Sequence, residues 1–265
     1  MAATSCLKPR CLVLSLVAAL AAAGAFARQP DPEPESPTDK KGEKATPAVD
    51  LARAATDARL AQQDRANQTK SSNHLKLIGI ALHNHNDTYG YLSNDIRDRR
   101  GKALLSWRVA LLPYLDQARL HKQFKLDEPW DSKHNLKLLE KMPDVFRSPR
   151  VKTRSKGNTV YQVFKGPNAP FGRAAAPRIP ASFPDGTSNT ILVVEATDAV
   201  PWTKPADIAF DRTKKLPDFG KAFGKRPLAV LADGSVRVLN LNTLREETLK
   251  NAIDPADGIP LGADW

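Results

Sequence analysis

The segment from Ala48 to Tyr89 constrains the fold most, because it contains no proline and no glycine before Gly79. It is rich in alanine, arginine, glutamine and leucine, which favour helix. In its second half, intervals of three and four residues place one set of side chains on a single helix face: Leu75, Ile78, Leu82, His85 and Tyr89. We therefore predict one helix over 48–89, with a solvated first half, a core-facing second half and Gly90 as its stop.

The predicted helix ends in HNHND (83–87), which raises the question of a metal site. His83 and His85 project about 200° apart on a helix, so they cannot share an ion. His74 shares a face with His85 but lies about 16 Å away along the axis. We therefore interpret His85 as a hydrogen-bonded histidine at the core edge. The neighbours Asn84, Asn86 and Asp87 are predicted to cap the helix end.

Residues 1–27 have the pattern of a secretory signal peptide. Lys8 and Arg10 precede an uncharged apolar stretch that ends in Ala25-Phe26-Ala27, a small-x-small cleavage pattern. The stretch is short and rich in alanine for a membrane span, which needs about 20 strongly apolar residues. We expect export to the periplasm or the cell exterior, with no stable membrane span after cleavage. The alternative is an N-terminal membrane anchor, if the signal stays uncleaved.

The positions of the cysteines and the distribution of charge limit the kinds of site and partner that the protein can have. Cys6 and Cys11 both lie within the signal, so the processed chain has no thiol for a disulfide, a metal site or a nucleophile. Loss of Lys8 and Arg10 lowers the formal net charge from +11 to +9. The basic residues are scattered without interleaved aromatic residues, so we expect no nucleic-acid binding. A basic exported protein is attracted instead to envelope proteins or surface polymers.

The processed chain divides into two parts. Residues 28–47 are proline-rich and charged without large apolar residues, and are predicted to be a disordered linker. Residues 48–265 are long enough for one domain, with the long helix at 48–89 and a globular part at 91–265.

The globular part begins with helical patterns. Helical spacing runs through 104–124, where Pro113 is expected to divide the segment into two short helices. Another short helix is expected within 127–143, starting near Asp131 or Ser132 and ending before Pro143.

Beyond Pro143 the pattern changes to strands, which are predicted at 159–164 and 190–196. Asp233-Gly234 predicts a tight hairpin between two strand-like runs in 227–240. A capping box from Thr243 to Glu246 predicts a last helix that ends near Ile253. These elements predict the α+β class: a long N-terminal helix packed on an antiparallel sheet, with short additional helices.

The stretch 183–208 has the densest polar and aromatic pattern. Asp185-Gly186, followed by Thr187, Ser188 and Asn189, predicts a turn whose side chains bond their own backbone. The alternative is a calcium site, with hard oxygen ligands from Asp185, Glu195 and Asp198, and from Asp207. Because EF-hand spacing is missing, we prefer the turn and expect no cofactor, with calcium as the only candidate.

Trp202 lies between Pro201 and Pro205 and has two interpretations. It can form an exposed platform for a sugar or peptide, with Lys204 and Asp207 as further ligand-binding residues. More often such a tryptophan packs a loop against the sheet and donates its indole N–H to backbone. We prefer the packing role.

Motifs for catalysis are missing from the sequence. It contains no G-x-S-x-G, H-E-x-x-H, P-loop or G-x-G-x-x-G pattern. A hydrolase built on Glu195 and Asp207 lacks catalytic spacing. We therefore expect no enzyme activity and assign no catalytic residue.

Four blocks resemble the domain-of-unknown-function family 1559: LKLIGIALHNHNDTYG, LLSWRVALLPYLDQARLHKQFKLDEPWDSKHN, FPDGTSNTILVVEATDAVPWTKPADI and LAVLADGSV. The resemblance covers roughly residues 48–250. The family is related to type II secretion pseudopilins, and its members often carry a prepilin-type N-terminal helix and a C-terminal H-X9-DG signature. The resemblance implies a pilin-like fold and no established activity. The family landmarks in this chain are His83, Asp87, Trp107, Pro113, Trp130, Asp185, Gly186, Asn189, Glu195, Trp202, Pro205, Asp233 and Gly234.

The sequence departs from the family pattern in three places. A secretory signal and the 28–47 linker replace the short basic leader, G-F-T-L-I-E-type site and apolar helix. The histidine of H-X9-DG is replaced by Phe223, and the middle segment Arg147-Ser148-Pro149 lacks the usual cysteine. These departures suggest a pseudopilin-type domain that is exported freely.

The sequence therefore favours an exported, non-enzymatic structural or interaction protein. We expect the sheet and the loops 165–185 and 197–225 to contact its partners, which would be envelope proteins or surface polymers. The alternative is a secreted binding module for an acidic glycan or a calcium-dependent ligand, using Trp202, Lys204, Asp185 and Asp207.

Overall fold

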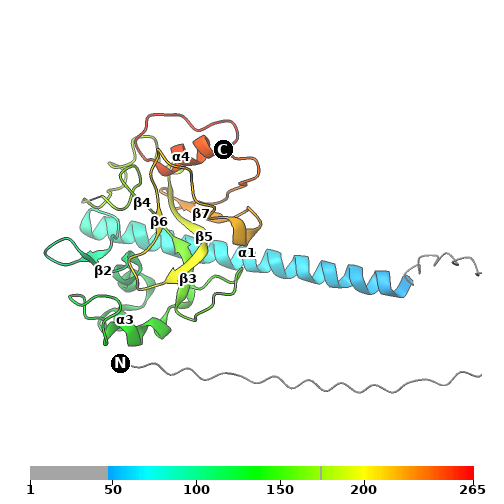
Figure 1. Cartoon of the computed structure of the whole chain (residues 1–265), viewed down its shortest axis with the longest axis horizontal. Helices are drawn as coiled ribbons and strands as arrows, with labels where there is room; N and C mark the ends of the chain where they lie inside the picture. Colours follow the sequence, from blue (N-terminus) through cyan, green and yellow to red (C-terminus); the bar gives the residue numbers. More distant parts are fainter. Residues whose placement is uncertain (1–46, 174) are drawn as a thin grey trace, which may run out of the picture. The chain divides into compact units, whose positions relative to one another are not determined.

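The computed structural model describes residues 47–173 and 175–265 (Figure 1). The predicted signal peptide and all but the last residue of the predicted linker lie outside this part of the chain. The described residues belong to one compact unit, Pro47–Trp265. Within it, no helix has both the length and the apolar character needed to cross a membrane.

Helix α1 (Pro47–Tyr89) matches the predicted long helix, and its burial follows the predicted division. Leu75, Ile78 and Leu82 are fully buried, because the apolar stripe faces the core. Residues 50–66 are all exposed, and Leu51 leaves 73% of its surface to solvent. Figure 1 accordingly shows the first half of α1 extending beyond the globular part.

The C-terminal end of α1 is partly as predicted. Gly90 has a φ of 78° and donates its N–H to the Asn86 carbonyl at 2.7 Å, which ends the helix. His85 is 6% exposed, with Nδ1 2.9 Å from the Tyr91 carbonyl, so the predicted core-edge role is confirmed. The predicted cap by Asn86 is wrong, because its side chain instead bonds both backbone groups of Ile179.

The middle of the chain is more fragmented than the predicted pair of helices. β1 (Ile96–Arg97) pairs with β2 (Ala103–Leu105), so 104–105 is strand where helix was predicted. Three single turns follow: α2 (Trp107–Ala110), η1 (Leu112–Leu115) and α3 (Ala118–His121). Pro113 sits at the start of η1, and left-handed Asp116 ends it. A proline lacks the N–H that a continuous helix needs, which explains the break.

The helix predicted within 127–143 is a 3₁₀ helix, η2 (Asn135–Lys141). Ser132 Oγ accepts the Asn135 N–H at 3.1 Å, so the predicted start residue acts just before the helix. A second 3₁₀ turn, η3 (Asp144–Phe146), leads into the strand region.

The main sheet is antiparallel, in the order β3–β5–β7–β8. Its strands are β3 (Asn158–Gln162), β5 (Ile191–Pro201), β7 (Leu228–Leu231) and β8 (Val236–Val238). The β7–β8 turn at Asp233-Gly234 confirms the predicted hairpin, with a φ of 85° at Gly234. A separate parallel pair joins β4 (Phe164–Lys165) to β6 (Ile208–Ala209).

The sheet separates two apolar cores, because alternate residues of β7 face opposite sides. Val230 packs in the core that contains Leu75 and Ile78 of α1. Leu231 packs in a second core with Ile253 of the last helix, α4 (Glu246–Ile253). The predicted α+β class, a long N-terminal helix on an antiparallel sheet with short additional helices, is therefore confirmed.

Helix α4 ends at Ile253 as predicted, but its predicted capping box does not form. The N-cap residue is Arg245, and no side chain caps it. Thr243 Oγ1 instead donates to the Asn240 carbonyl at 3.2 Å, and Glu246 Oε1 accepts the Leu216 N–H at 3.0 Å. Thr243 is thus engaged within its own turn, and Glu246 is engaged by the loop at Leu216.

Candidate functional site

A large bulge in β5 organises the candidate site. Thr159 of β3 pairs with Val200 of β5, and Tyr161 pairs with Glu195. A step of two residues along β3 therefore corresponds to five along β5, and the segment 196–199 leaves the regular ladder. Bulges of this kind re-aim side chains beside functional sites.

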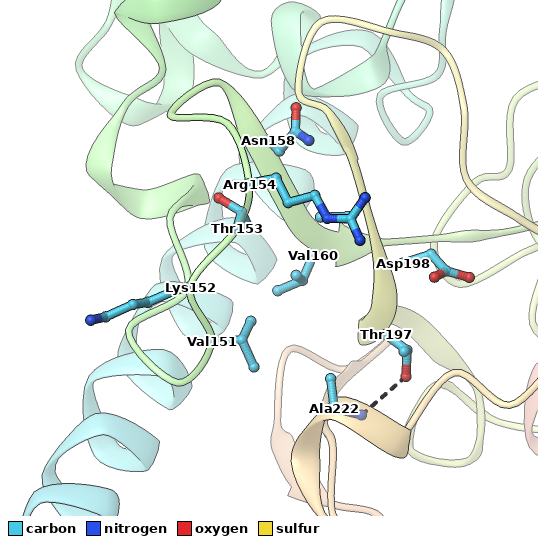
Figure 2. Close-up of a pocket in the computed structure, with 10 residues that line it drawn as sticks. Val151, Lys152, Thr153, Arg154, Asn158, Val160, Thr197, Asp198 and Ala222 are labelled. Atoms are coloured by element: carbon cyan, nitrogen blue, oxygen red, sulfur yellow. Dashed lines mark hydrogen bonds between the residues drawn. The ribbon is translucent and has the colours of Figure 1, made fainter. Parts of the chain in front are cut away.

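Two side chains fix the bulge in place. Gln162 of β3 donates its amide N–H to the Asp198 carbonyl. Thr197 Oγ1 accepts the Ala222 N–H at 3.2 Å, which ties the bulge to η5 (Lys221–Phe223). Figure 2 shows this second contact at the base of a cleft.

The first cleft lies between loop 151–158 and the bulge and has a volume of about 400 Å³. This is within the range of small-ligand sites. Its lining is Val151, Lys152, Thr153, Arg154, Asn158, Val160, Thr197, Asp198, Ala199 and Ala222. Polar and charged groups thus surround a small apolar floor.

The charge of this cleft comes from two exposed basic residues. Within the described residues, Lys152 and Arg154 form no ion pair, and Asp198 is the only acidic residue of the lining. Figure 2 shows Arg154 reaching across the cleft toward β5, whereas Lys152 points outward. A negatively charged group in the cleft would therefore meet Arg154 first.

A second cleft, of about 430 Å³, shares Thr197 and Asp198 with the first. Its lining is more apolar and includes Val200, Ile208 and Phe219. The bulge therefore carries a basic cleft and a more apolar one, with Thr197 and Asp198 common to both.

Glu195, immediately before the bulge, is fully buried and joins four parts of the fold. Its Oε1 accepts the Ser71 hydroxyl of α1 at 2.6 Å, and its Oε2 accepts the Leu228 N–H of β7 at 2.8 Å. Arg150 also pairs with Oε2, and the Tyr161 hydroxyl lies 2.7 Å from Ser71 Oγ. Burial raises the pKa of Glu195, and Arg150 and these hydrogen bonds oppose the rise only in part. Glu195 therefore holds the fold together and is withdrawn from solvent.

Arg150 connects this buried carboxylate to the walls of the first cleft. Its guanidinium donates to the Arg226 carbonyl at 3.2 Å and lies 5.0 Å from the centre of the Phe223 ring. Arg150 thereby connects loop 150–154 to η5. Phe223, which stands at the place of the signature histidine, is 6% exposed and serves as packing surface for this arginine.

Asp207 is the centre of a second buried network. Its Oδ1 lies 2.5 Å from Arg108 Nη2, and its Oδ2 lies 2.8 Å from Lys165 Nζ. Trp107 Nε1 and the Val163 N–H also donate to Oδ1, at 3.3 and 3.1 Å. The side chains of Asp207 and Arg108 are completely buried, so the Asp207 carboxylate is a structural anchor, although the residue also borders the second cleft.

The remaining residues suggested for ligand binding do not form an exposed platform. Trp202 is completely buried and donates its indole N–H to the Leu139 carbonyl at 2.9 Å, which confirms the preferred packing role. Its suggested role as a ligand platform is therefore wrong. Lys204 is exposed, and its Nζ lies 5.4 Å from the centre of the Trp130 ring.

The four suggested calcium ligands occupy different environments, and Asp207 lies in the buried network described above. Asp185 accepts the Gly258 N–H at 3.0 Å, Glu195 is buried in its ion pair, and Asp198 lies in the bulge. Among residues 47–173 and 175–265, no three His, Asp or Glu side chains gather around one point as metal ligands. The turn interpretation agrees with the geometry, since Asn189 Nδ2 donates to the Asp185 carbonyl at 2.8 Å and Gly186 has a φ of 107°.

Other family landmarks lie around the hairpin and the end of α1. A Cβ on Gly234 would lie 3.6 Å from His83 Nε2, so this ring packs on the turn. Asp233 Oδ1 accepts the Ser235 N–H at 2.8 Å within that turn. Asp87 is exposed, and the Pro205 carbonyl faces Lys165 Nζ at 3.4 Å. Of these landmarks, His83, Asp233 and Gly234 serve the packing and geometry of the hairpin turn.

Sequence reasoning missed the first cleft. A signal was present in RVKTRSK, where every second residue from Arg150 to Lys156 is basic. That alternation does not stand out, because lysine and arginine are common throughout the chain. The bulge had no sequence signal, because it depends on the pairing of β5 with residues of β3 that lie 32 to 43 positions earlier in the chain.

The fold and the site define an α+β protein with a partly free N-terminal helix and a basic cleft beside a bulged strand. Residues 62–180 match the family described as "Protein of unknown function (DUF1559)", which confirms the resemblance over that segment. The match includes loop 151–158 of the first cleft and ends before the bulge. No curated protein and no solved structure matches the chain.

Proposed function

We propose that this chain is an exported, non-enzymatic interaction protein that contacts its partner at the first cleft and the β5 bulge. The observation that carries the proposal is the contrast between the buried and the accessible groups. The accessible side chains, such as Arg154, Asn158 and Thr197, are suited to recognition. Glu195 and Asp207, the two carboxylates suggested for a hydrolase, are buried in ion pairs.

The position of these carboxylates argues against a role in bond breaking. A general acid or base must come within hydrogen-bond reach of the substrate. Each carboxylate is completely buried and already receives several hydrogen bonds and a cation. Displacing those partners would leave buried charges unpaired, which is strongly unfavourable.

The form of α1 supports a structural or interaction role of pseudopilin-like type. Its second half is packed in the core, whereas its first half is a solvated helix that can meet a partner. Isolated helices are marginal in water, so the packed half serves to nucleate the free half. Envelope proteins or surface polymers are the partners that we propose for an exported protein of this charge.

Export is tested by the N-terminus and intact mass of the native protein in soluble and membrane fractions. We expect a chain that begins at Arg28 in the soluble fraction. An intact Met1 in the membrane fraction would contradict release and would make residues 11–27 an anchor.

The interaction is tested by a photo-reactive amino acid placed at Asn158, on the cleft wall, with Arg99 as the control position. Arg99 is exposed in a turn and does not line the cleft. Illumination with cell-envelope material should give adducts from position 158 that are missing from position 99. Identical adduct patterns at both positions would contradict the proposed contact site.

A further inference from the structure

We propose that the first cleft binds a carboxylated sugar, with the carboxylate held by Arg154. This inference rests on the proposed interaction function and names the ligand class for the same site. Guanidinium presents five N–H donors in a planar fork that matches a carboxylate. Within the described residues, the Arg154 side chain makes no ion pair or hydrogen bond, so all five donors are available.

The charges around the cleft favour a single carboxylate inside it, so that only one acidic sugar of a longer chain occupies the cleft. The Arg150 charge is already matched by Glu195, which leaves Arg154 as the cation that reaches across the cleft. Lys152 points outward and adds attraction over a longer distance. Asp198 on the same lining disfavours a second anionic group within the cleft, because the two negative charges would repel each other.

The remaining polar groups suit the hydroxyls of a sugar ring. Thr197 Oγ1 already accepts the Ala222 N–H, which leaves its O–H free to donate. Thr153 Oγ1 donates to the Ser155 carbonyl, which leaves its lone pairs free to accept. The Asn158 amide can do both. The lining therefore offers both donors and acceptors beside one cation, which suits a hydroxylated ring better than an acidic peptide.

The cleft is also held open before a ligand arrives. Arg150 joins one wall to the Arg226 carbonyl and the Phe223 ring, and Thr197 joins the bulge to η5. Gln162 fixes the bulge from the neighbouring strand. Because these contacts order the walls in advance, little conformational entropy is lost on binding.

The experiment is calorimetric titration of the full chain with tetragalacturonate, with its methyl-esterified form and with tetraglutamate. We expect tetragalacturonate to bind at least about tenfold tighter than either comparison ligand, since charge-assisted hydrogen bonds are the strong ones. Arg154→Gln should weaken tetragalacturonate binding at least about tenfold, and Arg154→Lys should weaken it less, because the charge remains but the fork is lost. Arg99→Gln, which removes an equal charge elsewhere, should leave affinity within about twofold.

Four results would overturn the inference. Equal affinity for the methyl ester would show that the carboxylate is not recognised, and equal affinity for tetraglutamate would assign the cleft to acidic peptides. Unchanged affinity in Arg154→Gln, with an unchanged unfolding midpoint as proof of folding, would place the ligand elsewhere. Cross-links from position 158 without galacturonate binding would overturn this ligand class and leave the interaction function standing.

Discussion

Arg150 and Arg154 are four residues apart and carry the same charge, yet their surroundings give them different roles. Arg150 is paired with buried Glu195 and contacts the Phe223 ring. Arg154 is exposed at the rim of the first cleft. Substitution of Arg150 should therefore affect stability, whereas substitution of Arg154 should affect binding alone.

Arg150→Gln should destabilise the fold in a pH-dependent way. Without this cation, the pKa of Glu195 rises further above its ordinary value of 4.5. The folded variant then keeps a proton that the unfolded chain releases above pH 4.5, so its stability falls as pH rises from 4.5 through the raised pKa. We expect a loss of about 3–5 kcal/mol near neutral pH and a smaller loss at pH 5, measured by urea unfolding.

The double variant Arg150→Gln/Glu195→Gln is the control for this pairing. It removes the unpaired carboxylate and should recover much of the lost stability, with little dependence on pH. A loss in Arg150→Gln that is the same at pH 5 and pH 8 would contradict the coupling.

His85 should make the fold sensitive to acid. Burial lowers the pKa of His85 below its ordinary value of 6.5, and the hydrogen bond to the Tyr91 carbonyl opposes this only in part. The unfolded chain therefore binds a proton below pH 6.5 that the folded chain still refuses, so stability falls as pH falls from 6.5 toward the lowered pKa. Thermal unfolding between pH 7 and pH 5 should show a smaller decline in His85→Gln than in the parent chain. An equal decline would assign the acid sensitivity to other groups.

At the scale of elements, the close packing of α1 on the β7–β8 hairpin depends on Gly79. A Cβ at this position would lie 2.9 Å from Val230 Cγ2. Gly79→Leu should therefore destabilise the fold by about 1–3 kcal/mol through overpacking. Adding Val230→Ala should relieve part of this loss in a double-mutant cycle. Additive effects of the two substitutions would contradict direct contact.

Elements governed by local chemistry could be predicted from the sequence. The apolar stripe of α1 as far as His85, its glycine stop and the Asp233-Gly234 hairpin depend on neighbours in the chain and are confirmed. Tyr89, the last residue of the predicted stripe, is instead 57% exposed. The predicted cap by Asn86 and the predicted reach-back of Glu246 are wrong, because distant loops engage these two side chains. Thr243 instead bonds the Asn240 carbonyl within its own turn. The basic cleft escaped prediction for the same reason, since its walls meet through the long-range contacts of Arg150 and Thr197.

At the scale of the whole molecule, the free half of α1 should contribute little to folding. Residues 50–63 are exposed throughout, so their removal exposes almost no apolar core. A chain that starts at Asp64 should keep its urea unfolding free energy within about 0.5 kcal/mol, as expected for surface changes. Circular dichroism should show a loss of helix signal confined to the deleted turns. A collapse of the unfolding midpoint would show that this half supports the globular part.

At the scale of the whole molecule, we propose that partner recognition takes place at the first cleft, whereas the buried carboxylates Glu195 and Asp207 serve the fold. The most direct test is co-sedimentation of the full chain with cell-envelope material, comparing the parent, Lys152→Gln/Arg154→Gln and the matched control Arg99→Gln/Arg100→Gln. All four substituted residues are exposed, so the two double variants change charge equally without touching the core. We expect the parent and the control each to sediment with the envelope material, whereas the cleft variant should stay in the supernatant. Equal sedimentation of all three proteins would contradict recognition at the cleft.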